Sequence, residues 1–255
     1  MQKLYSAKAH FENFKQRIKI DAEKEWDLGN EIFFDKIKSI EDYKSFKEKL
    51  NIKIPHCKLL DDFYKESENI LVLGAGDGTK DVEFVKNYRD KNIILSDISP
   101  QILEFIAPFY KFKARKVDIR NIDFARDNFD FVYAQAIDSF FNDKEYKRVV
   151  SEMSRVVKPG HCFILTTVCL EKPGTDILKN ALKKIFSFIP VIWITIYKII
   201  KKQDIKWTGY MRSLNEHFKI FSAVGGIMLE KIDFDYKADN SLYSVAFIFR
   251  KVKDL

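Results

Sequence analysis

The sequence predicts an α/β fold: a doubly wound, mostly parallel, seven-stranded sheet with one antiparallel edge strand. Three observations support this prediction. The glycine-rich turn "GAGDG" directly follows the apolar run "NILVL" at residues 69–73. From residue 68 onward, short β-rich runs alternate with helical segments. Two β-rich runs then close the chain with only "KADN" between them, which predicts a hairpin.

Residues 1–67 are expected to form an N-terminal helical cap, because aromatic side chains recur there at helical spacing. Pro55 interrupts this cap, and a further helix is predicted in "HCKLLDDFYKES" at 56–67. Residues 68–255 then form the α/β domain, with an inserted segment at about 173–210. The length of 255 residues suits one such domain with an added lobe.

Within the α/β domain, each β-rich run is bounded by helical segments or turn residues. The seven strands are expected at residues 69–74, 92–98, 114–119, 129–137, 161–170, 227–236 and 241–252. The helices between them are expected at residues 78–88, 99–110, 143–157 and 212–226.

Local signals mark several of these helix ends. Ser99 is a candidate N-cap, and Pro100 suits the first helical position. Ser213 and Glu216 have the spacing of a capping box. The sequence "KPG" at 158–160 is expected to end the third helix, because proline cannot continue a helix and glycine tolerates the turn.

The glycine-rich turn is typical of a strand that passes into a helix beside a nucleotide-like ligand. It contains no GxxxxGK[ST] sequence, so a P-loop is excluded. A dinucleotide fingerprint would require a third glycine where Thr79 stands, and a β-branched residue would obstruct the helix–strand contact there. The pattern present is GxGxG, formed by Gly74, Gly76 and Gly78.

Five motifs in the same order resemble the class I S-adenosylmethionine-dependent methyltransferases over residues 68–250. They are "LGAGDGT", Asp97 at the end of the second strand, "SDISPQILE", "VDIRNIDFARDNFDFVYAQAI" and "EMSRVVKPGHCFILTT". The last is the most specific local match. The resemblance implies that the protein is a transferase that uses S-adenosylmethionine as its methyl donor.

The resemblance also implies a set of cofactor-binding residues. The glycines would admit the methionine part of the cofactor. The Asp97 carboxylate would accept hydrogen bonds from the ribose hydroxyls, and Asp118 with Ile119 would frame the adenine. The full set is Leu73, Gly74, Ala75, Gly76, Asp77, Gly78, Asp97, Ile98, Asp118, Ile119 and Gln135.

Two positions depart from the family pattern. Val72 stands where the family often has an acid that helps to hold the methionine amino group, so backbone carbonyls or Asp77 are expected to replace it. His161 replaces the second glycine of "KPGG" and is expected to be a structural turn residue.

The residues that act on the acceptor are less clearly marked. Asp138, just after the fourth strand, is the candidate catalytic residue, as a base or an acceptor-orienting acid; a helix N-cap or a solvated carboxylate is the alternative. His217 is expected at the surface. Tyr5, His10 and Phe11 resemble lid helices of the family, with amphipathic packing as the alternative. Sequence motifs for methylating the exocyclic amines of bases or cytosine C5 do not occur, so DNA is not expected as a partner.

The inserted segment contains the most unusual stretch, "IFSFIPVIWITIYKII" at 185–200, which is flanked by lysines. Its 16 residues contain Pro190 and Lys198, whereas a membrane span needs about 20 apolar residues. It could cover a hydrophobic or anionic acceptor, pack as a dimer or core element, or rest on a membrane surface. Residues 175–212 carry eight basic and two acidic side chains, so most of the net charge of +7 lies in this part.

These observations predict methyl transfer to an oxygen or nitrogen of a small-molecule, glycan or lipid-linked acceptor. The alternatives are a protein or RNA methyltransferase and a non-catalytic cofactor-binding subunit. The N-terminal residues contain no apolar signal sequence, which favours a cytoplasmic protein, with residues 185–200 as a candidate peripheral membrane contact. Cys57, Cys162 and Cys169 are expected to be reduced, buried thiols, and no metal site is predicted.

Overall fold

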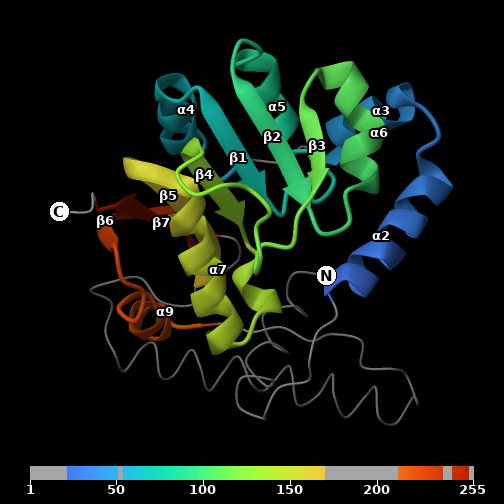
Figure 1. Cartoon of the computed structure of the whole chain (residues 1–255). Helices are drawn as coiled ribbons and strands as arrows, with labels where there is room; N and C mark the ends of the chain where they lie inside the picture. Colours follow the sequence, from blue (N-terminus) through green and yellow to red (C-terminus); the bar gives the residue numbers. More distant parts are fainter. Residues whose placement is uncertain (1–21, 51–53, 170–211, 238–242, 253–255) are drawn as a thin grey trace, which may run out of the picture.

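The computed structural model describes residues 22–50, 54–169, 212–237 and 243–252. Its seven strands form one sheet in the order β3-β2-β1-β4-β5-β7-β6 (Figure 1). The strands are β1 (Asn69–Leu73), β2 (Asn92–Asp97), β3 (Lys113–Lys116), β4 (Phe129–Gln135), β5 (Val157–Cys169), β6 (Ile227–Lys237) and β7 (Tyr243–Lys251). Strands β1 to β5 are parallel, and β7 runs antiparallel to both β5 and β6. The predicted seven-stranded, mostly parallel sheet is confirmed, with the reversed strand β7 lying between β5 and β6.

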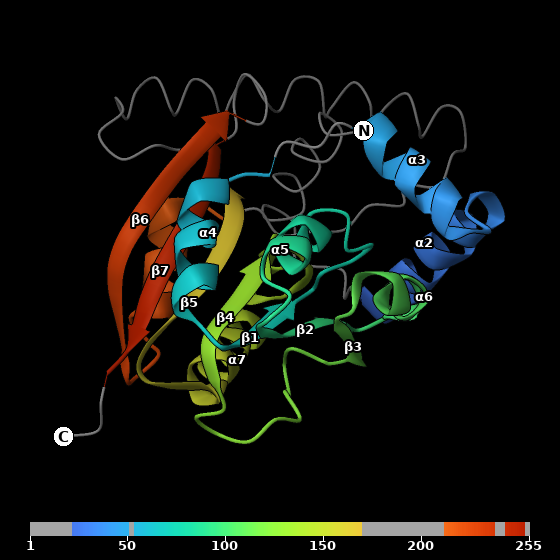
Figure 2. The ribbon, with the colours of Figure 1, turned by 90° about the horizontal axis from the view of Figure 1, so that it is seen from above.

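Helices cover both faces of this sheet (Figure 2). They are α2 (Ala22–Lys36), α3 (Ile40–Leu50), α4 (Cys57–Glu66), α5 (Asp81–Asn87), α6 (Gln101–Tyr110), α7 (Asp143–Val156) and α9 (Leu214–Phe221). A short 3₁₀ helix, η1 (Asp138–Phe140), follows β4. Residues of α3, α4, α5 and α6 share one apolar cluster with the sheet, and residues of α7 and α9 share the other.

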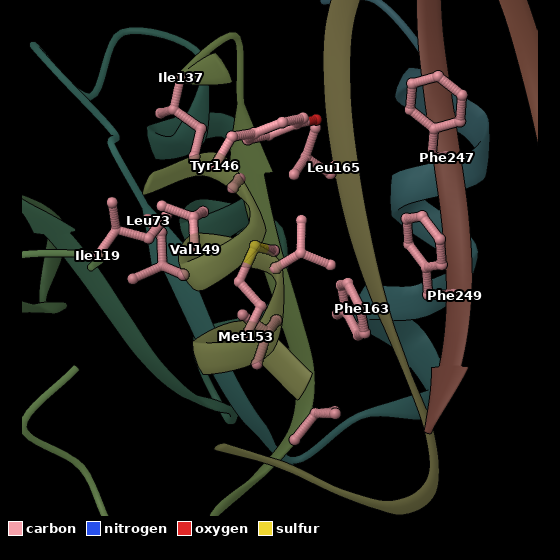
Figure 3. Packing of buried hydrophobic residues seen from close by; sticks show 14 of the residues in the cluster. Leu73, Ile119, Ile137, Tyr146, Val149, Met153, Phe163, Leu165, Phe247 and Phe249 are labelled. Atoms are coloured by element: carbon pink, nitrogen blue, oxygen red, sulfur yellow. The ribbon is translucent and has the colours of Figure 1, made fainter. Parts of the chain in front are cut away.

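Helix α7 shows how the sequence builds one of these faces. Asn142 caps its first turn, accepting a hydrogen bond from the Glu145 N–H while the Glu145 side chain returns to the Asn142 N–H. Tyr146, Val149 and Met153 recur at helical spacing, and all are fully buried against the sheet (Figure 3). This packing holds α7 close to the ends of β4 and β5.

The helices expected as an N-terminal cap are built onto the opposite face. Tyr43 of α3 and Leu60 and Tyr64 of α4 are fully buried in the same cluster as Val72 of β1 and Tyr133 of β4. The Tyr64 ring stacks on that of Phe84 of α5, with 4.7 Å between ring centroids. The described part of residues 1–67 therefore shares its core with the sheet.

The passage from α7 to β5 differs from the sequence prediction. Strand β5 begins at Val157, four residues earlier than expected, and includes Pro159 and Gly160. The register between β4 and β5 shifts there, because Phe129 pairs with Val157 while Phe131 pairs with Cys162. Proline and glycine are tolerated at such an irregularity because the regular ladder of hydrogen bonds is already interrupted.

Two capping predictions had different outcomes. The capping box of Ser213 and Glu216 is present at the start of α9 and is confirmed. The prediction of Ser99 as the N-cap of α6 was wrong, because Pro100 occupies that position. The Ser99 hydroxyl instead lies 2.7 Å from the Asn30 side-chain amide of α2, so a contact between distant segments replaces the local cap.

Several predictions fall outside the described residues. They concern the inserted segment at about 173–210, including the apolar stretch 185–200, and the lid candidates Tyr5, His10 and Phe11. Within the described ranges, no helix is long and apolar enough to cross a membrane. The same ranges contain no cluster of histidine, cysteine and acidic side chains that could hold a metal ion.

Candidate functional site

The glycine-rich turn lies at the carboxyl end of β1, beside β4. The strand order reverses between β1 and β4, and open α/β sheets bind ligands at such a switch point. Gly74, Gly76 and Gly78 all have positive φ angles, of +67°, +58° and +67°. Side chains other than glycine rarely adopt this conformation, so the three glycines allow the turn to fold back on itself.

Gly74 also permits a close approach between the turn and the segment after β4. A Cβ atom at Gly74 would lie only 2.5 Å from the Cγ2 atom of Ile137. Ala136, next to Ile137, has a φ of +52°, which is uncommon for a residue with a side chain. Its N–H donates a 2.8 Å hydrogen bond to the Thr166 carbonyl of β5, which holds this conformation. Backbone of this kind often marks a binding site.

Asp97, the last residue of β2, fastens the glycine turn from the other side. The Gly76 N–H donates to Asp97 Oδ2 at 2.9 Å, and the Ser99 N–H donates to Asp97 Oδ1 at 3.1 Å. The side chain is buried, and this burial raises its pKa against the lowering effect of the Ser99, Gly76 and Ile98 N–H groups. An ionised carboxylate can accept about four hydrogen bonds, so this one retains capacity for a ligand hydroxyl.

These elements enclose a cavity of about 420 Å³ at the carboxyl ends of the strands. Its walls come from the glycine turn, the start of α5 and the segments after β2, β3 and β4. The lining residues are Gly74, Ala75, Gly76, Asp77, Lys80, Asp81, Asp97, Ile98, Val117, Asp118, Ile119, Arg120, Gln135, Ala136, Ile137, Phe140 and Phe141.

The cavity is acidic as well as partly apolar. Four aspartates line it (Asp77, Asp81, Asp97 and Asp118), together with two basic side chains, Lys80 and Arg120. Such a balance favours a cationic ligand. It disfavours the phosphate groups of a dinucleotide or nucleoside triphosphate, because four carboxylates would repel them.

Asp118 is already engaged with a neighbour. Arg120 donates to both of its carboxylate oxygens, with Nε to Oδ1 and Nη2 to Oδ2 distances of 2.9 Å each. Burial acts to raise the pKa of Asp118, but the hydrogen bonds and charge of Arg120 outweigh it and the pKa is lowered. Asp118 is therefore held as an ion pair at the cavity wall.

Most of the residues expected to bind the cofactor lie together at this cavity. Two do not line it. Leu73 is buried in the apolar cluster on the α7 face, and a Cβ atom at Gly78 would meet the side chains of Leu103 and Ile106 of α6 at 3.0 Å. Gly78 thus permits close packing of the turn on α6.

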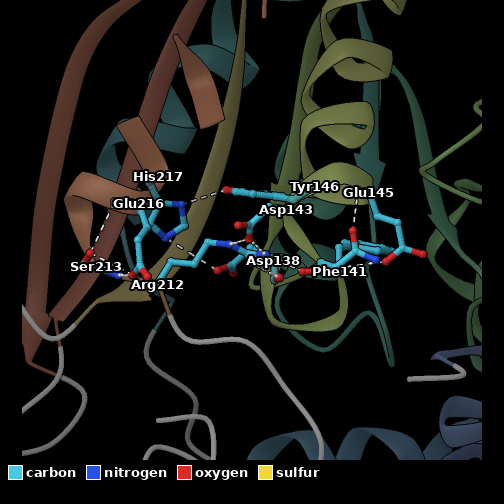
Figure 4. A network of polar contacts seen from close by, with 10 residues as sticks. Asp138, Phe141, Asp143, Glu145, Tyr146, Arg212, Ser213, Glu216 and His217 are labelled. Carbon is cyan, nitrogen blue, oxygen red and sulfur yellow. Dashed lines mark hydrogen bonds and ion pairs between the residues drawn. The ribbon is translucent and has the colours of Figure 1, made fainter. Parts of the chain in front are cut away.

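Asp138 does not line the cavity, although Ile137 and Phe140 beside it do. Its buried side chain enters a polar network between η1, β5 and α9 (Figure 4). The Thr167 hydroxyl donates to Asp138 Oδ1 at 2.7 Å, and His217 Nε2 lies 3.8 Å from Asp138 Oδ2. Burial raises the pKa of Asp138 to about 6, against the lowering effect of Arg212. The alternative of a solvated carboxylate or helix N-cap is excluded, because the side chain is buried and Asn142 caps α7.

Arg212 joins this network to the 3₁₀ turn. Its Nη1 donates to the Asp138 carbonyl at 2.8 Å and its Nη2 to the Phe141 carbonyl at 2.5 Å. It also pairs with Asp143 at the start of α7, at 3.0 Å. The guanidinium is buried and stacks 4.7 Å from the centre of the Tyr146 ring. These contacts fix the segment that carries Phe140 and Phe141 into the cavity wall.

Two burial predictions were wrong. His217 was expected at the surface but is fully buried, with its Nδ1 3.2 Å from the Tyr146 hydroxyl. Burial, together with the charge of Arg212, lowers its pKa to about 3, so it is neutral at physiological pH. Cys57 was expected to be buried but is exposed at the start of α4, whereas Cys162 is buried as expected. For Cys169, the last residue of β5, only the backbone is described, so its expected burial stays a prediction.

Several lining residues were not among the candidates from the sequence. Lys80 and Asp81 follow the glycine turn directly in the sequence, so their place in the cavity wall could have been predicted from that position. Arg120 follows Asp118 by two positions and could have been inferred in the same way. Phe140 and Phe141 carry no such signal, because the contacts of Arg212 bring them to the cavity.

Residues 70–160 match a family model described as a methyltransferase domain. Over these residues the chain is similar to that family. The match agrees with the resemblance to the class I S-adenosylmethionine-dependent methyltransferases that the sequence motifs indicate. No curated protein is significantly similar to the chain in sequence.

Solved structures share the fold of the methyltransferase domain. A S-adenosylmethionine-dependent methyltransferase from Methanosarcina mazei has a TM-score of 0.55 and 14% identity, over 77% of this chain and 98% of that one. The [4+2]-cyclase SpnF has a TM-score of 0.54 and 14% identity, over 76% and 80% of the two chains. A geranyl diphosphate C-methyltransferase from Streptomyces coelicolor A3(2), in complex with S-adenosyl-L-homocysteine, has a TM-score of 0.51 and 11% identity, over 76% and 79%.

Proposed function

We propose that the protein transfers the methyl group of S-adenosylmethionine to an oxygen or nitrogen of a small-molecule, glycan or lipid-linked acceptor. The observation that carries the proposal is the acidic cavity at the switch point between β1 and β4, which the glycine turn and Asp97 border. S-adenosylmethionine carries a sulfonium and an ammonium group, so its charge suits a cavity with four aspartates and two basic side chains.

The residues of this chain would bind and orient the cofactor. The remaining lone pairs of the Asp97 carboxylate would accept from the ribose hydroxyls. The glycine turn would allow its backbone to approach the methionine part, and Ile119 and the Asp118 segment would border the adenine. When bound, the cofactor supplies an electrophilic methyl group for an in-line displacement. Positioning the acceptor in line can supply much of the rate acceleration.

The proposed class of methyl acceptor rests on two apolar features of the chain. Phe140 and Phe141 add aromatic surface to the cavity wall, and the apolar stretch 185–200 with its flanking lysines lies in the same chain. One protein of the same fold is named for acting on geranyl diphosphate, a ligand that is both apolar and anionic. We place the activity in the cytoplasm, with residues 185–200 as the candidate contact with a membrane surface.

The test begins with binding, followed by transfer. Calorimetry with S-adenosylhomocysteine and with NAD should show binding of the first and none of the second. Transfer of labelled methyl groups to a lipid and glycan extract, to RNA and to total protein then distinguishes the acceptor classes. Labelling of RNA or protein alone would contradict the proposed acceptor. Cofactor binding without labelling of any of them would favour a non-catalytic binding subunit.

A further inference from the structure

Asp81 stands out among the charged residues of the cavity, because its buried carboxylate accepts a hydrogen bond from its own backbone N–H but from no other described residue. Only 4% of the residue is exposed, and it lines the cavity at the start of α5. An ionised carboxylate that is buried without a partner is costly. A cationic group in the cavity would remove most of that cost.

The other cavity aspartates already have partners. Asp97 accepts from the Gly76 and Ser99 N–H groups, and Asp118 is paired with Arg120. Asp77 accepts from the Thr79 N–H at 2.9 Å, which stabilises the turn itself. Asp81 is therefore the cavity carboxylate that is most available to a ligand.

The position of Asp81 also bears on a residue that is missing from β1. Val72 stands where the resemblance to the class I methyltransferases implies an acid, and its side chain is buried in the cluster that contains Val82 of α5. Asp81 begins that same helix, at the border between this cluster and the cavity. A carboxylate of the helix that follows β1 thus lies at the cavity, where β1 itself contributes none.

Lys80 lies next to Asp81 and also lines the cavity. Burial lowers its pKa, while the charges of Asp81 and Asp77 act in the opposite direction. One cationic and one anionic side chain, adjacent at one end of the cavity, complement the two charges of an α-amino acid.

We propose that Asp81 and Lys80 recognise the amino-acid end of the cofactor, with Asp81 binding its ammonium group and Lys80 its carboxylate. This inference rests on the proposed function. These two residues would then distinguish nucleoside ligands that carry an amino-acid part from those that lack it. Asp77 and the backbone carbonyls would not have this role.

The titratable groups around Asp81 predict that ligand binding depends on pH. Burial raises the pKa of Asp81 to about 7, Lys80 opposes this shift, and Asp77 adds to it. From the other packed elements, the groups that interact with Asp81 are the hydroxyls of Tyr43, Tyr64 and Tyr133, which stay neutral because burial raises each pKa. An ammonium ion bound beside Asp81 would stabilise its ionised form, so binding below pH 7 should release a proton from the carboxyl group to the buffer.

The decisive experiment compares two ligands by calorimetry: S-adenosylhomocysteine and 5′-methylthioadenosine, which lacks the amino-acid part. Asp81→Asn should weaken the binding of S-adenosylhomocysteine by about 10- to 100-fold, as expected for a lost charge-assisted hydrogen bond. It should change the binding of 5′-methylthioadenosine by less than about three-fold. Lys80→Met should also act selectively on S-adenosylhomocysteine, by about 3- to 10-fold.

Asp77→Asn is the matched control, because its side-chain oxygen can still accept from the Thr79 N–H. It should leave both affinities within about three-fold of the unmodified protein. Calorimetry at pH 6.5 in buffers of different ionisation enthalpy should show proton release with S-adenosylhomocysteine, and Asp81→Asn should abolish it.

The outcomes separate this inference from the proposed function. If neither nucleoside binds to the unmodified protein, the proposed function fails and the inference fails with it. If both bind and Asp81→Asn weakens them equally or not at all, only the inference is overturned. A selective loss in Asp77→Asn, without one in Asp81→Asn, would likewise overturn it by assigning the ammonium group to Asp77.

Discussion

Two buried aspartates on opposite sides of the β1–β4 switch point behave differently. Asp138 is satisfied from several elements: Thr167 of β5 donates to its side chain, Arg212 donates to its carbonyl, and His217 lies nearby. Asp81 is equally well buried, but no described residue other than Asp81 itself donates to its carboxylate, which borders the cavity. Burial alone therefore does not mark a ligand-binding carboxylate. The missing donor from another residue, together with the cavity, does.

The energetic consequences of the two arrangements should be opposite. Removing a partner from the Asp138 network leaves buried polar groups unsatisfied, which destabilises the fold. Removing the charge of Asp81 eliminates a cost that the ligand-free fold bears, which stabilises it. Four substitutions test this contrast, from the largest expected effect to the smallest.

Arg212→Met should lower the free energy of unfolding by about 3–5 kcal/mol, the usual effect of removing the partner of a buried charge, because the buried Asp138 carboxylate would lose the nearby charge of Arg212. Asp143 and the carbonyls of Asp138 and Phe141 would lose their donors. Urea denaturation measures the change. Arg115→Met is the control, because Arg115 pairs with Asp123 at an exposed site, and it should cost less than about 1 kcal/mol. Equal costs for the two variants would contradict a stabilising role of the buried network.

Asp81→Asn should raise the free energy of unfolding of the ligand-free protein at pH 8, by up to about 4 kcal/mol. The pKa of Asp81 is about 7 in the fold and 3.8 as its model value, and each pKa unit is worth about 1.4 kcal/mol. A raised folded pKa means that the fold binds more protons than the unfolded chain between these values. The destabilising effect of Asp81 is therefore absent below about pH 4 and complete above about pH 7.

Urea denaturation of Asp81→Asn and the unmodified protein at pH 4.5, 6 and 8 measures this gain. It should grow steadily with pH. A loss of stability at pH 8 would show that Asp81 has stabilising partners in the ligand-free protein and would remove the contrast with Asp138.

Gly74→Ala should destabilise the fold by about 1–3 kcal/mol and weaken nucleoside binding, because the new Cβ atom would clash with Ile137 and the positive φ would be strained. Gly225→Ala is a matched control, since nothing lies within 4 Å of its added Cβ atom. Thermal unfolding and calorimetry with S-adenosylhomocysteine measure the two effects. Equal behaviour of the variants would contradict the close approach of the glycine turn to Ile137.

Asp138→Asn should change the affinity for S-adenosylhomocysteine by less than about two-fold, because its side chain does not line the cavity. Asparagine keeps an oxygen that can accept from Thr167. The acceptor-orienting role proposed for Asp138 predicts reduced turnover at unchanged cofactor affinity. Unchanged turnover would leave Asp138 with a structural role, whereas a large loss of cofactor affinity would show that η1 supports the cavity more directly.

Much of the fold could be predicted because its signals are local. The β-rich runs predicted all seven strands in their observed chain order. Helical spacing predicted the helices between them, and the capping box of Ser213 marked the start of α9. Element ends were less predictable where long-range contacts compete with local ones. Asn30 of α2 engages Ser99, and the irregular pairing of β4 with β5 takes Pro159 into a strand.

The glycine turn and Asp97 could be identified as a site from the sequence alone, because spacing and residue type determine their geometry. A strand that ends in GxGxG must turn sharply, and a carboxylate at the end of the neighbouring parallel strand must lie close to that turn. The tertiary structure decided which other charged side chains matter. It buried His217, turned Asp138 into a polar network and left Asp81 facing the cavity without a donor from any other described residue. Partners and burial arise from residues far apart in the chain, so the local pattern around each aspartate could not distinguish them.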